Sequence, residues 1–246
     1  MSALAKVAAR NDGAATIIPG IDWKSVARDL DEAGYATARG VFTSEVCERV
    51  RGWYAQESLF RSRIVMARHG FGQGEYQYFA YPLPTLIEEL RRGLYERLAP
   101  VANAWSASLG SDVRYPTALS SFLEQCHAQG QSRPTPLMLK YAPGDYNRLH
   151  QDLYGGIQFP LQAAVLLSAP DKDFDGGEFV LTQTAPRRQT RAEVVPLAQG
   201  DMVIFAVNHR PVRSVKGFAR VAMRHGVSTL RRGERYTLGI ILHDAT

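Results

Sequence analysis

The feature that most constrains the fold is a change of pattern in the second half of the chain. From position 136 onward, short apolar runs are separated by turn residues. Period-2 or fully apolar runs of this length, bounded by turn signals, predict β-strands. The expected strands cover residues 137–141, 160–167, 178–182, 192–195, 201–206, 221–230 and 235–243. Many short strands with turns between them predict a jelly-roll sandwich.

The first half of the chain has helical spacing instead. Leucines at positions 86, 90, 94 and 98 fall on one face of a helix predicted over residues 85–109. Thr43 is expected to cap a helix that runs to about residue 56. Further helices are predicted over residues 22–36 and 117–128, and a short strand over residues 34–42.

These patterns predict a mainly β protein with flanking α-helices. A chain of 246 residues is of ordinary length for one β-rich domain. We expect a loose leader over residues 1–20, a helical scaffold with a lid over residues 21–135, and the jelly-roll core over residues 136–246.

A candidate metal site lies within the predicted core. His150 and Asp152 are two positions apart, and in extended chain such residues point to the same side. A His-X-Asp tripeptide is common by chance, so the prediction depends on a second histidine, His225, on a later strand. Two histidines and one carboxylate form the facial triad that suits non-haem Fe(II) and leaves positions open for a co-substrate and oxygen.

Arg235 follows His225 by ten residues. Residues 231–233, Arg-Arg-Gly, read as a turn between the last two predicted strands, so we expect a hairpin that carries Arg235 back toward the metal. A guanidinium binds a carboxylate through two parallel hydrogen bonds. Iron at one end and arginine at the other would hold a dicarboxylic keto acid such as 2-oxoglutarate.

With these residues in place, the chain resembles the Fe(II)/2-oxoglutarate-dependent dioxygenases. Tyr141–Gly144 followed after five residues by His150–Asp152 resembles the AlkB-type nucleic acid demethylases, whereas Gly233–Leu238 is closer to the prolyl-hydroxylase-like branch. With Gly176–Phe179 and Gly200–Phe205, the C-terminal half is similar to a bacterial oxygenase family predicted to demethylate damaged DNA bases oxidatively.

The resemblance implies a double-stranded β-helix core, Fe(II) as the metal, and 2-oxoglutarate and O2 as co-substrates. The implied metal-ligating and catalytic residues are His150, Asp152 and His225, and the implied co-substrate residues are Arg235, Tyr141 and Thr237. The chain departs from the AlkB pattern where Thr237 replaces an asparagine, Ile241 replaces a second arginine and Leu139 replaces another asparagine. The side chains with which AlkB-type enzymes bind the keto-acid end of 2-oxoglutarate are therefore absent.

Residues 62–84 combine three glycines with several aromatic residues. One interpretation is a mobile lid whose rings bind substrate; the candidate residues are Arg68, His69, Phe71, Tyr76 and Tyr78. The other is a β-hairpin whose aromatic side chains pack, and both stay open because lids are often hairpins. Two basic clusters, Arg187, Arg188 and Arg191 with Arg210, Arg213 and Lys216, are expected beside the pocket mouth for phosphates.

Composition sets broad bounds. The net charge of +5 mildly favours anionic partners such as nucleic acids or nucleotides, although many basic enzymes bind none. No apolar run is long enough for a membrane helix, so no membrane partner is expected. The two cysteines have no metal-type spacing, and a reducing cytoplasm is the expected compartment.

Other polar residues are interpreted as structural. His127 is expected to cap a helix, His243 to lie on the surface and Asp201 to form a turn. Three classes of function stay open: a dioxygenase acting on alkylated nucleobases, the same chemistry on a protein side chain, amino acid or metabolite, and a binding protein that has lost catalysis. The pairing of the predicted triad with Arg235 argues against the third.

Overall fold

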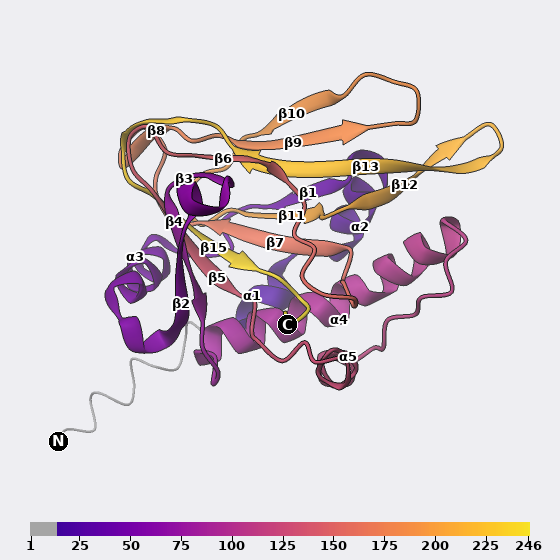
Figure 1. The fold of residues 1–246 in the computed structure, drawn as a ribbon, viewed down its shortest axis with the longest axis horizontal. Helices are drawn as coiled ribbons and strands as arrows, with labels where there is room; N and C mark the ends of the chain where they lie inside the picture. The colour runs from indigo at the N-terminus through magenta and orange to yellow at the C-terminus, as the bar shows by residue number, and fades with distance from the viewer. Residues whose placement is uncertain (1–13) are drawn as a thin grey trace.

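The chain folds into two facing β-sheets with helices packed along one of them (Figure 1). The structure is a computed structural model that describes the backbone of residues 14–246 and the side chains of residues 17–246. The larger sheet contains β1 (Tyr35–Ala38), β2 (Phe60–Val65), β4 (Glu75–Phe79), β5 (Leu137–Tyr141), β7 (Leu161–Leu166), β11 (Met202–Ala206) and β15 (Arg235–Ile240). Their order across the sheet is β1-β11-β7-β15-β5-β4-β2.

The smaller sheet lies across from it. It contains β3 (Gly72–Gln73), β6 (Tyr146–His150), β9 (Phe179–Thr184), β10 (Arg191–Val195), β12 (His209–Ser214) and β13 (Gly217–Val227). The order is β10-β9-β13-β6-β3, and β12 pairs with β13. Two further strands, β8 (Phe174–Gly176) and β14 (Leu230–Gly233), pair only with each other among the described residues.

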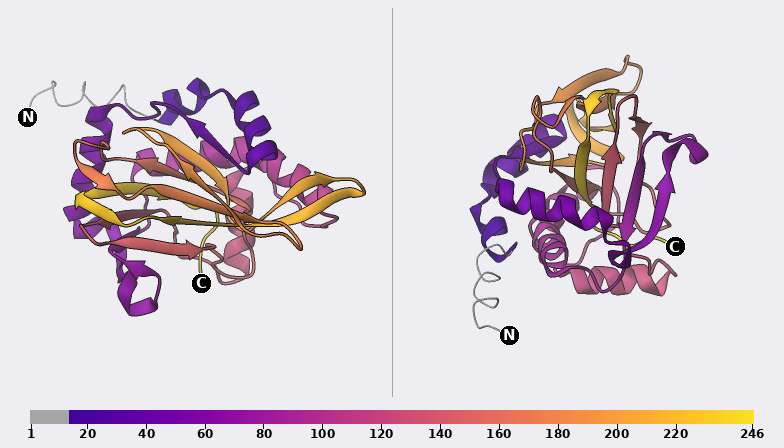
Figure 2. Two further views of the ribbon diagram at one scale, coloured as in Figure 1. Left: turned by 90° about the horizontal axis from the view of Figure 1, so that it is seen from above. Right: turned by 90° about the vertical axis from the view of Figure 1, so that its left-hand side faces the viewer.

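The helices cover the outer side of the larger sheet (Figure 2). They are α1 (Ala14–Gly20), α2 (Trp23–Ala33), α3 (Ser44–Gly52), α4 (Thr85–Ser108) and α5 (Leu119–Ala128). Asp22 caps α2 and Thr43 caps α3, each by accepting hydrogen bonds from backbone N–H groups of the first turn. The leucine stripe of α4 is buried in the main core between the helices and this sheet. In the described part of the chain, no helix has the length and hydropathy to cross a membrane.

The predicted mainly β fold with a jelly-roll core and N-terminal scaffold helices is confirmed. The hairpin expected between residues 221–230 and 235–243 is wrong. β13 ends at Val227 in the smaller sheet, whereas β15 pairs with β5 and β7 in the larger sheet. Residues 231–233 belong to β14 and do not form a turn between these strands. Gly233 is required there because a Cβ would overlap the carbonyl oxygen of Asp173, and the sequence alone does not distinguish such a close approach from a turn.

The segment over residues 62–84 is a hairpin built into the larger sheet. β2 pairs with β4, and β4 also pairs with β5, so β4 is an interior strand and not a lid. Tyr78 is buried there. Between β2 and β4, the chain passes through β3, which pairs with β6 of the smaller sheet. Residues 66–73 therefore bridge the two sheets at one edge.

Other expectations also need correction. Residues 14–20 of the expected leader form α1, whose Ile18 is buried against Gly93 of α4, and residues 1–13 lie outside the described residues. His243 is buried, and its Nδ1 accepts a hydrogen bond from the backbone of Phe159.

The two other polar predictions differ in outcome. His127 pairs with the Asp244 carboxylate at 2.8 Å and does not cap the helix through its ring. Asp201 is structural as predicted, since it accepts hydrogen bonds from the backbone of Gly40 and from Arg39.

The expected basic surface also changes. Arg210 is buried and donates to the carbonyl oxygens of Asp31 and Glu32, so it is not available to phosphates. Lys216 lies at the turn between β12 and β13, eight to nine residues along the strand from His225. At about 3.3 Å per residue, that turn lies well away from the candidate metal site, not beside it.

Candidate active site

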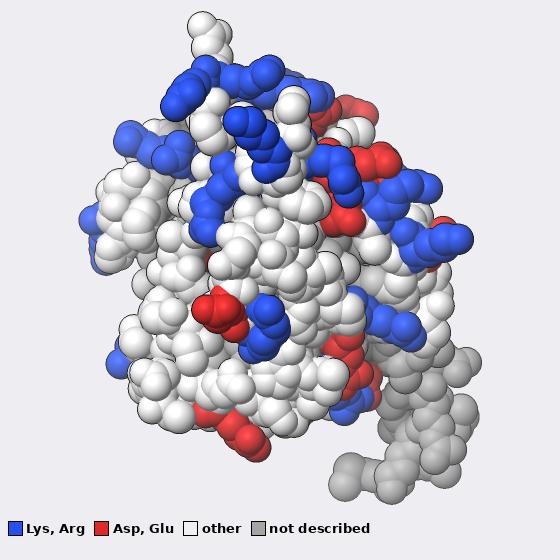
Figure 3. Space-filling view, turned by 90° about the vertical axis from the view of Figure 1, so that its right-hand side faces the viewer, with Lys and Arg blue, Asp and Glu red and all other residues white. Residues whose placement is uncertain are grey.

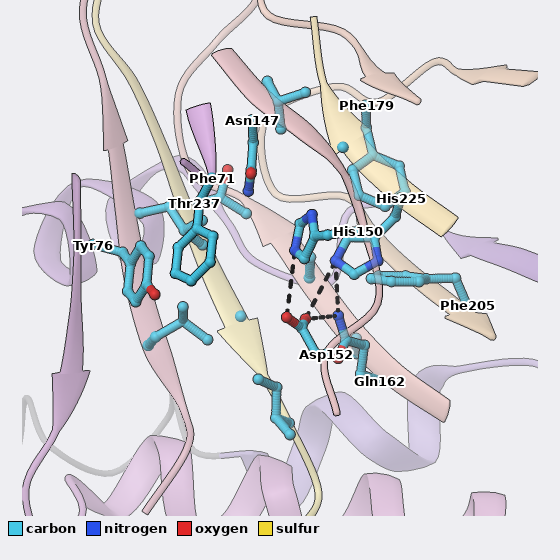
Figure 4. Close-up of a pocket in the computed structure, with 18 of the residues that line it drawn as sticks. Phe71, Tyr76, Asn147, His150, Asp152, Gln162, Phe179, Phe205, His225 and Thr237 are labelled. Carbon is cyan, nitrogen blue, oxygen red and sulfur yellow. Dashed lines mark hydrogen bonds and ion pairs between the residues drawn. The ribbon is translucent and has the colours of Figure 1, made fainter. Parts of the chain in front are cut away.

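The two candidate histidines come from neighbouring strands of the smaller sheet. β6 and β13 are antiparallel, and His150 lies directly opposite His225 in the register. The ring centroids are 4.2 Å apart. The register shifts just after His225, where Gly226 has no room for a side chain because a Cβ would lie 2.7 Å from the carbonyl oxygen of Asn147. The close strand approach therefore presents both imidazoles to one point (Figure 4).

Asp152 reaches the same point from the chain that leaves β6. Its Oδ1 is 3.3 Å from His150 Nε2, and its Oδ2 is 3.3 Å from His225 Nε2. One nitrogen or oxygen from each of the three residues lies within 4.8 Å of the others. The structure thus brings together the three residues that the sequence pattern grouped, and no other such group of three His, Cys, Asp or Glu residues occurs in the described chain.

Two donors that sequence analysis missed hold the Asp152 carboxylate. The Tyr154 hydroxyl donates to Oδ1 at 2.8 Å, and the Gln162 side-chain amide donates to Oδ2 at 2.9 Å. Tyr154 follows Asp152 by two residues, just as His150 precedes it by two. This spacing could have been used to predict that Tyr154 contacts Asp152. Gln162 comes from β7 in the opposite sheet, and nothing in the sequence indicates that contact.

The His150 tautomer and the pKa shifts of His225 and Asp152 suit metal binding. Burial alone would lower the pKa of His150, but its contacts with Asp152 raise it. His150 Nδ1 lies 2.7 Å from the carbonyl oxygen of Arg148. A carbonyl only accepts, so Nδ1 carries the proton, and in the neutral ring Nε2 keeps its lone pair. Burial lowers the pKa of His225, and the neighbouring His150 lowers it further. Burial alone would raise the pKa of Asp152, but its contacts with His150 and His225 hold that pKa well below its usual range.

Two phenylalanine rings lie beside His225. Phe205 and Phe179 lie 4.7 and 6.2 Å from the His225 ring, centroid to centroid. Two imidazoles and one carboxylate in an apolar surround match the donor set of a non-haem Fe(II) centre with open positions. The residues present therefore fit an iron ion.

Arg235 lies in the same pocket and is almost completely buried. Its Nη1 donates to the Thr237 hydroxyl at 2.7 Å, but its Nε has no hydrogen-bond partner, and it forms no ion pair with any described carboxylate. Burial lowers its pKa. Gly177 leaves room for this side chain, since a Cβ there would lie 2.9 Å from Arg235 Cδ.

Tyr141 lies beside Arg235 on the adjacent strand of the larger sheet. The two residues are paired between β5 and β15, and the guanidinium carbon is 5.7 Å from the Tyr141 ring centroid. The Tyr141 hydroxyl lies near the Asn147 side chain but makes no hydrogen bond of good geometry, and burial raises its pKa to about 12. A buried guanidinium and a buried hydroxyl, both with unused donors, are costly unless a ligand satisfies them. Together they fit the distal carboxylate of 2-oxoglutarate.

Only two of the five predicted substrate residues line the pocket. Phe71 and Tyr76 line the pocket, whereas Arg68, His69 and Tyr78 do not. Phe71 lines the pocket and is 46% exposed, and the side chain of His150 is 32% exposed. Both residues therefore lie where the pocket opens to solvent, at its mouth. The His69 ring stacks on Phe71 at 5.4 Å with 21° between the planes. The mouth is therefore aromatic, next to the candidate metal site.

Comparison with known proteins gives one family. Residues 74–245 match the Oxygenase-NA family, which is described as an oxygenase catalysing oxidative methylation of damaged DNA. An uncharacterized protein of Mycobacterium tuberculosis is 48% identical over 200 residues, which cover 79% of this chain and 86% of that protein.

Solved structures agree on the fold. A 2OG-Fe(II) oxygenase family oxidoreductase from Burkholderia pseudomallei superimposes with a TM-score of 0.53 at 17% identity, over 92% of this chain and 94% of that chain. A prolyl 4-hydroxylase from Phytophthora capsici gives a TM-score of 0.54 at 16% identity, over 93% of this chain and 64% of that chain. At these identities the likeness concerns the fold alone.

Proposed function

Because this chain belongs to the Oxygenase-NA family, we propose that it removes alkyl groups oxidatively from nucleobases, using a pocket formed by His150, Asp152, His225 and Arg235. The chain is a 2-oxoglutarate-dependent dioxygenase that uses Fe(II) as its cofactor and 2-oxoglutarate and O2 as co-substrates. The substrate and the role of each residue are our proposal.

In the proposed site, His150, Asp152 and His225 hold Fe(II), and Arg235 binds the distal carboxylate of 2-oxoglutarate beside Tyr141 and Thr237. With O2 and 2-oxoglutarate, the iron centre supplies hydroxylation of a C–H bond, coupled to conversion of 2-oxoglutarate to succinate and CO2. Tyr154 and Gln162 keep the Asp152 oxygens in place. The phenylalanine rings beside His225 keep water away from that imidazole.

On an N-methyl group, hydroxylation gives an N–CH2OH group. This group loses formaldehyde when its C–N bond breaks and the nitrogen takes the hydroxyl proton, which restores the unmodified base. A base within a duplex must be flipped out or already single-stranded to enter such a pocket.

The observation that best supports a nucleobase is Phe71. It lines the pocket, is 46% exposed, and is backed by the His69 ring. An exposed aromatic ring at a pocket mouth stacks on a base, which stabilises binding by about 1–3 kcal/mol per base. We also propose the reducing cytoplasm as the compartment, because Cys47 and Cys126 are free thiols and reducing conditions keep iron ferrous.

The test is formaldehyde release. The protein, Fe(II) and 2-oxoglutarate are incubated with single-stranded oligonucleotides carrying N-methylated bases, and separately with a pool of cellular peptides and metabolites. We expect formaldehyde from the oligonucleotides, at a rate that falls with added salt. No formaldehyde there, together with a product sixteen mass units heavier in the other pool, would replace the demethylase proposal.

Hydroxylation of a protein side chain, amino acid or metabolite is the second candidate. It is favoured by Ile241, which lines the pocket at the position where AlkB-type enzymes carry a second arginine. The same assay decides between the two functions.

A further inference from the structure

The outer face of the smaller sheet, opposite the pocket, carries a row of arginines. Along β13, Val221, Met223 and His225 are buried, whereas Arg220, just before Val221, and Arg224, just before His225, are exposed. Side chains alternate between the two faces of a strand, so both arginines point away from the candidate metal site. They are four residues apart, about 13 Å along the strand.

The neighbouring strand extends this row. In the β12–β13 register, Arg213 pairs with Phe218, and Pro211 pairs with Arg220, so Arg213 and Phe218 share the face of Arg220. The Arg213 guanidinium carbon lies 5.4 Å from the Phe218 ring centroid, and the ring is 43% exposed. The row therefore ends in an exposed aromatic ring beside a cation.

The strands on the other side of β13 add no negative charge. The residues that share this face are Val180, Thr182 and Thr184 on β9, and Ala192 and Val194 on β10. None of these positions, nor those of β12 and β13 on the same face, is Asp or Glu. Arg213, Arg220 and Arg224 form no ion pair with any described residue. Figure 3 shows Lys and Arg gathered toward the top of the molecule, with Asp and Glu beside them at the upper right.

The face reaches the pocket mouth through Arg148. This exposed residue lies on β6 between Asn147 and His150, which both line the pocket. The register between β6 and β13 shifts here, so the alternation is interrupted and Arg148 does not line the pocket. Its backbone N–H donates to the carbonyl oxygen of Phe71 at 2.8 Å, so it sits beside the aromatic ring that marks the mouth. Arg224 precedes His225 on the adjacent strand. The row thus extends from Arg213, near the turn between β12 and β13, to Arg148 at the mouth.

We propose that this outer arginine face, formed by Arg213, Phe218, Arg220, Arg224 and Arg148, binds the backbone of single-stranded DNA whose modified base enters the pocket. The inference rests on the proposed nucleobase substrate. Arginines spaced along a sheet bind phosphates, and an exposed aromatic ring stacks on a base with little sequence preference. A sheet face with cations, hydroxyls and no carboxylate suits an anionic polymer.

The test measures binding, without catalysis. A fluorescently labelled, unmodified single-stranded oligonucleotide is titrated with protein at several salt concentrations, and affinity is read from fluorescence anisotropy. The variant is Arg220→Gln/Arg224→Gln. The matched control is Arg92→Gln/Arg97→Gln, which removes the same charge from exposed positions on α4, on the opposite side of the molecule. Thermal unfolding of each variant verifies its fold.

Log affinity falls with log salt, and loss of two phosphate contacts makes this fall less steep by about 1.4. The variant should therefore bind about 25-fold more weakly than the wild type at 0.1 M salt. We expect this loss in the test variant and wild-type affinity in the control. Phe218→Ala should weaken binding by at least about fivefold.

Two results would overturn the inference: no binding by the wild type, or equal losses in test and control variants. Binding through this face without formaldehyde release from methylated oligonucleotides would support the surface and reject only the proposed reaction.

Discussion

His150 and His225 are opposite each other in the register of β6 and β13, with their ring centroids 4.2 Å apart. Strand pairing therefore sets the position of both imidazoles, and Asp152 joins them from the chain immediately after β6. Because Gly226 permits the close approach of these strands, the geometry of the site depends on the sheet itself. Several consequences can be measured.

Arg235→Met should weaken 2-oxoglutarate binding by about 2–5 kcal/mol, because a buried charge-assisted contact is lost. Arg235→Lys should restore it only in part, since an ammonium cannot make two parallel hydrogen bonds to a carboxylate. The dissociation constant is measured by titrating the metal-loaded protein with 2-oxoglutarate in the absence of oxygen. Unchanged affinity in Arg235→Met would assign the carboxylate to another residue.

Tyr154→Phe should weaken metal binding by about 10–100-fold, because the carboxylate of Asp152 loses the donor to its Oδ1. Metal affinity is measured by calorimetric titration with Fe(II) or Mn(II). The control is Tyr95→Phe, which also removes a tyrosine hydroxyl, one that bonds to the carbonyl oxygen of Pro116. Equal affinities in the two variants would show that Tyr154 does not position the ligand.

His243 should make stability depend on pH. Burial lowers its pKa to about 4, whereas an unfolded histidine titrates near 6.5. Between these values the unfolded chain binds a proton that the folded chain does not, so acidification lowers the free energy of unfolding, by up to about 1.4 kcal/mol per pH unit. Above pH 6.5 the residue has no effect.

The matched variant is His243→Asn, whose side-chain oxygen can still accept from Phe159. Urea unfolding at several pH values should show a shallower decline for this variant between pH 6.5 and 4. Parallel profiles for the two proteins would refute the assignment.

Local patterns in the sequence predict much of the fold. The leucine spacing of α4, the Thr43 cap and the apolar strand β7 each depend on neighbours within a few residues, and the structure contains all of them. The partner of the last strand does not depend on such neighbours. β15 follows β13 by few residues, yet it pairs with β5 and β7 because its apolar residues pack in the larger sheet.

In the site, too, the sequence predicts features set by local spacing but not contacts set by tertiary packing. The spacing of His150 and Asp152 is local, and the later predicted strands supplied His225 and Arg235; all four residues line one pocket. Gln162 reaches Asp152 from the opposite sheet, and His243 is buried by contacts distant in sequence. Such contacts are set by tertiary packing, so the sequence pattern of each residue gives no indication of them.

The central claim is that His150, Asp152 and His225 hold the iron that oxidises 2-oxoglutarate. Succinate formation with Fe(II) and 2-oxoglutarate tests it most directly, in the wild type, in His225→Ala and in the control His209→Ala, which changes a partly exposed histidine on β12. Since losses around a metal's ligands cost about 10–100-fold, loss of a ligand itself should cost more than that. We expect His225→Ala to fold and to lose activity by more than about 100-fold, with His209→Ala fully active; wild-type succinate formation by a folded His225→Ala would contradict the account.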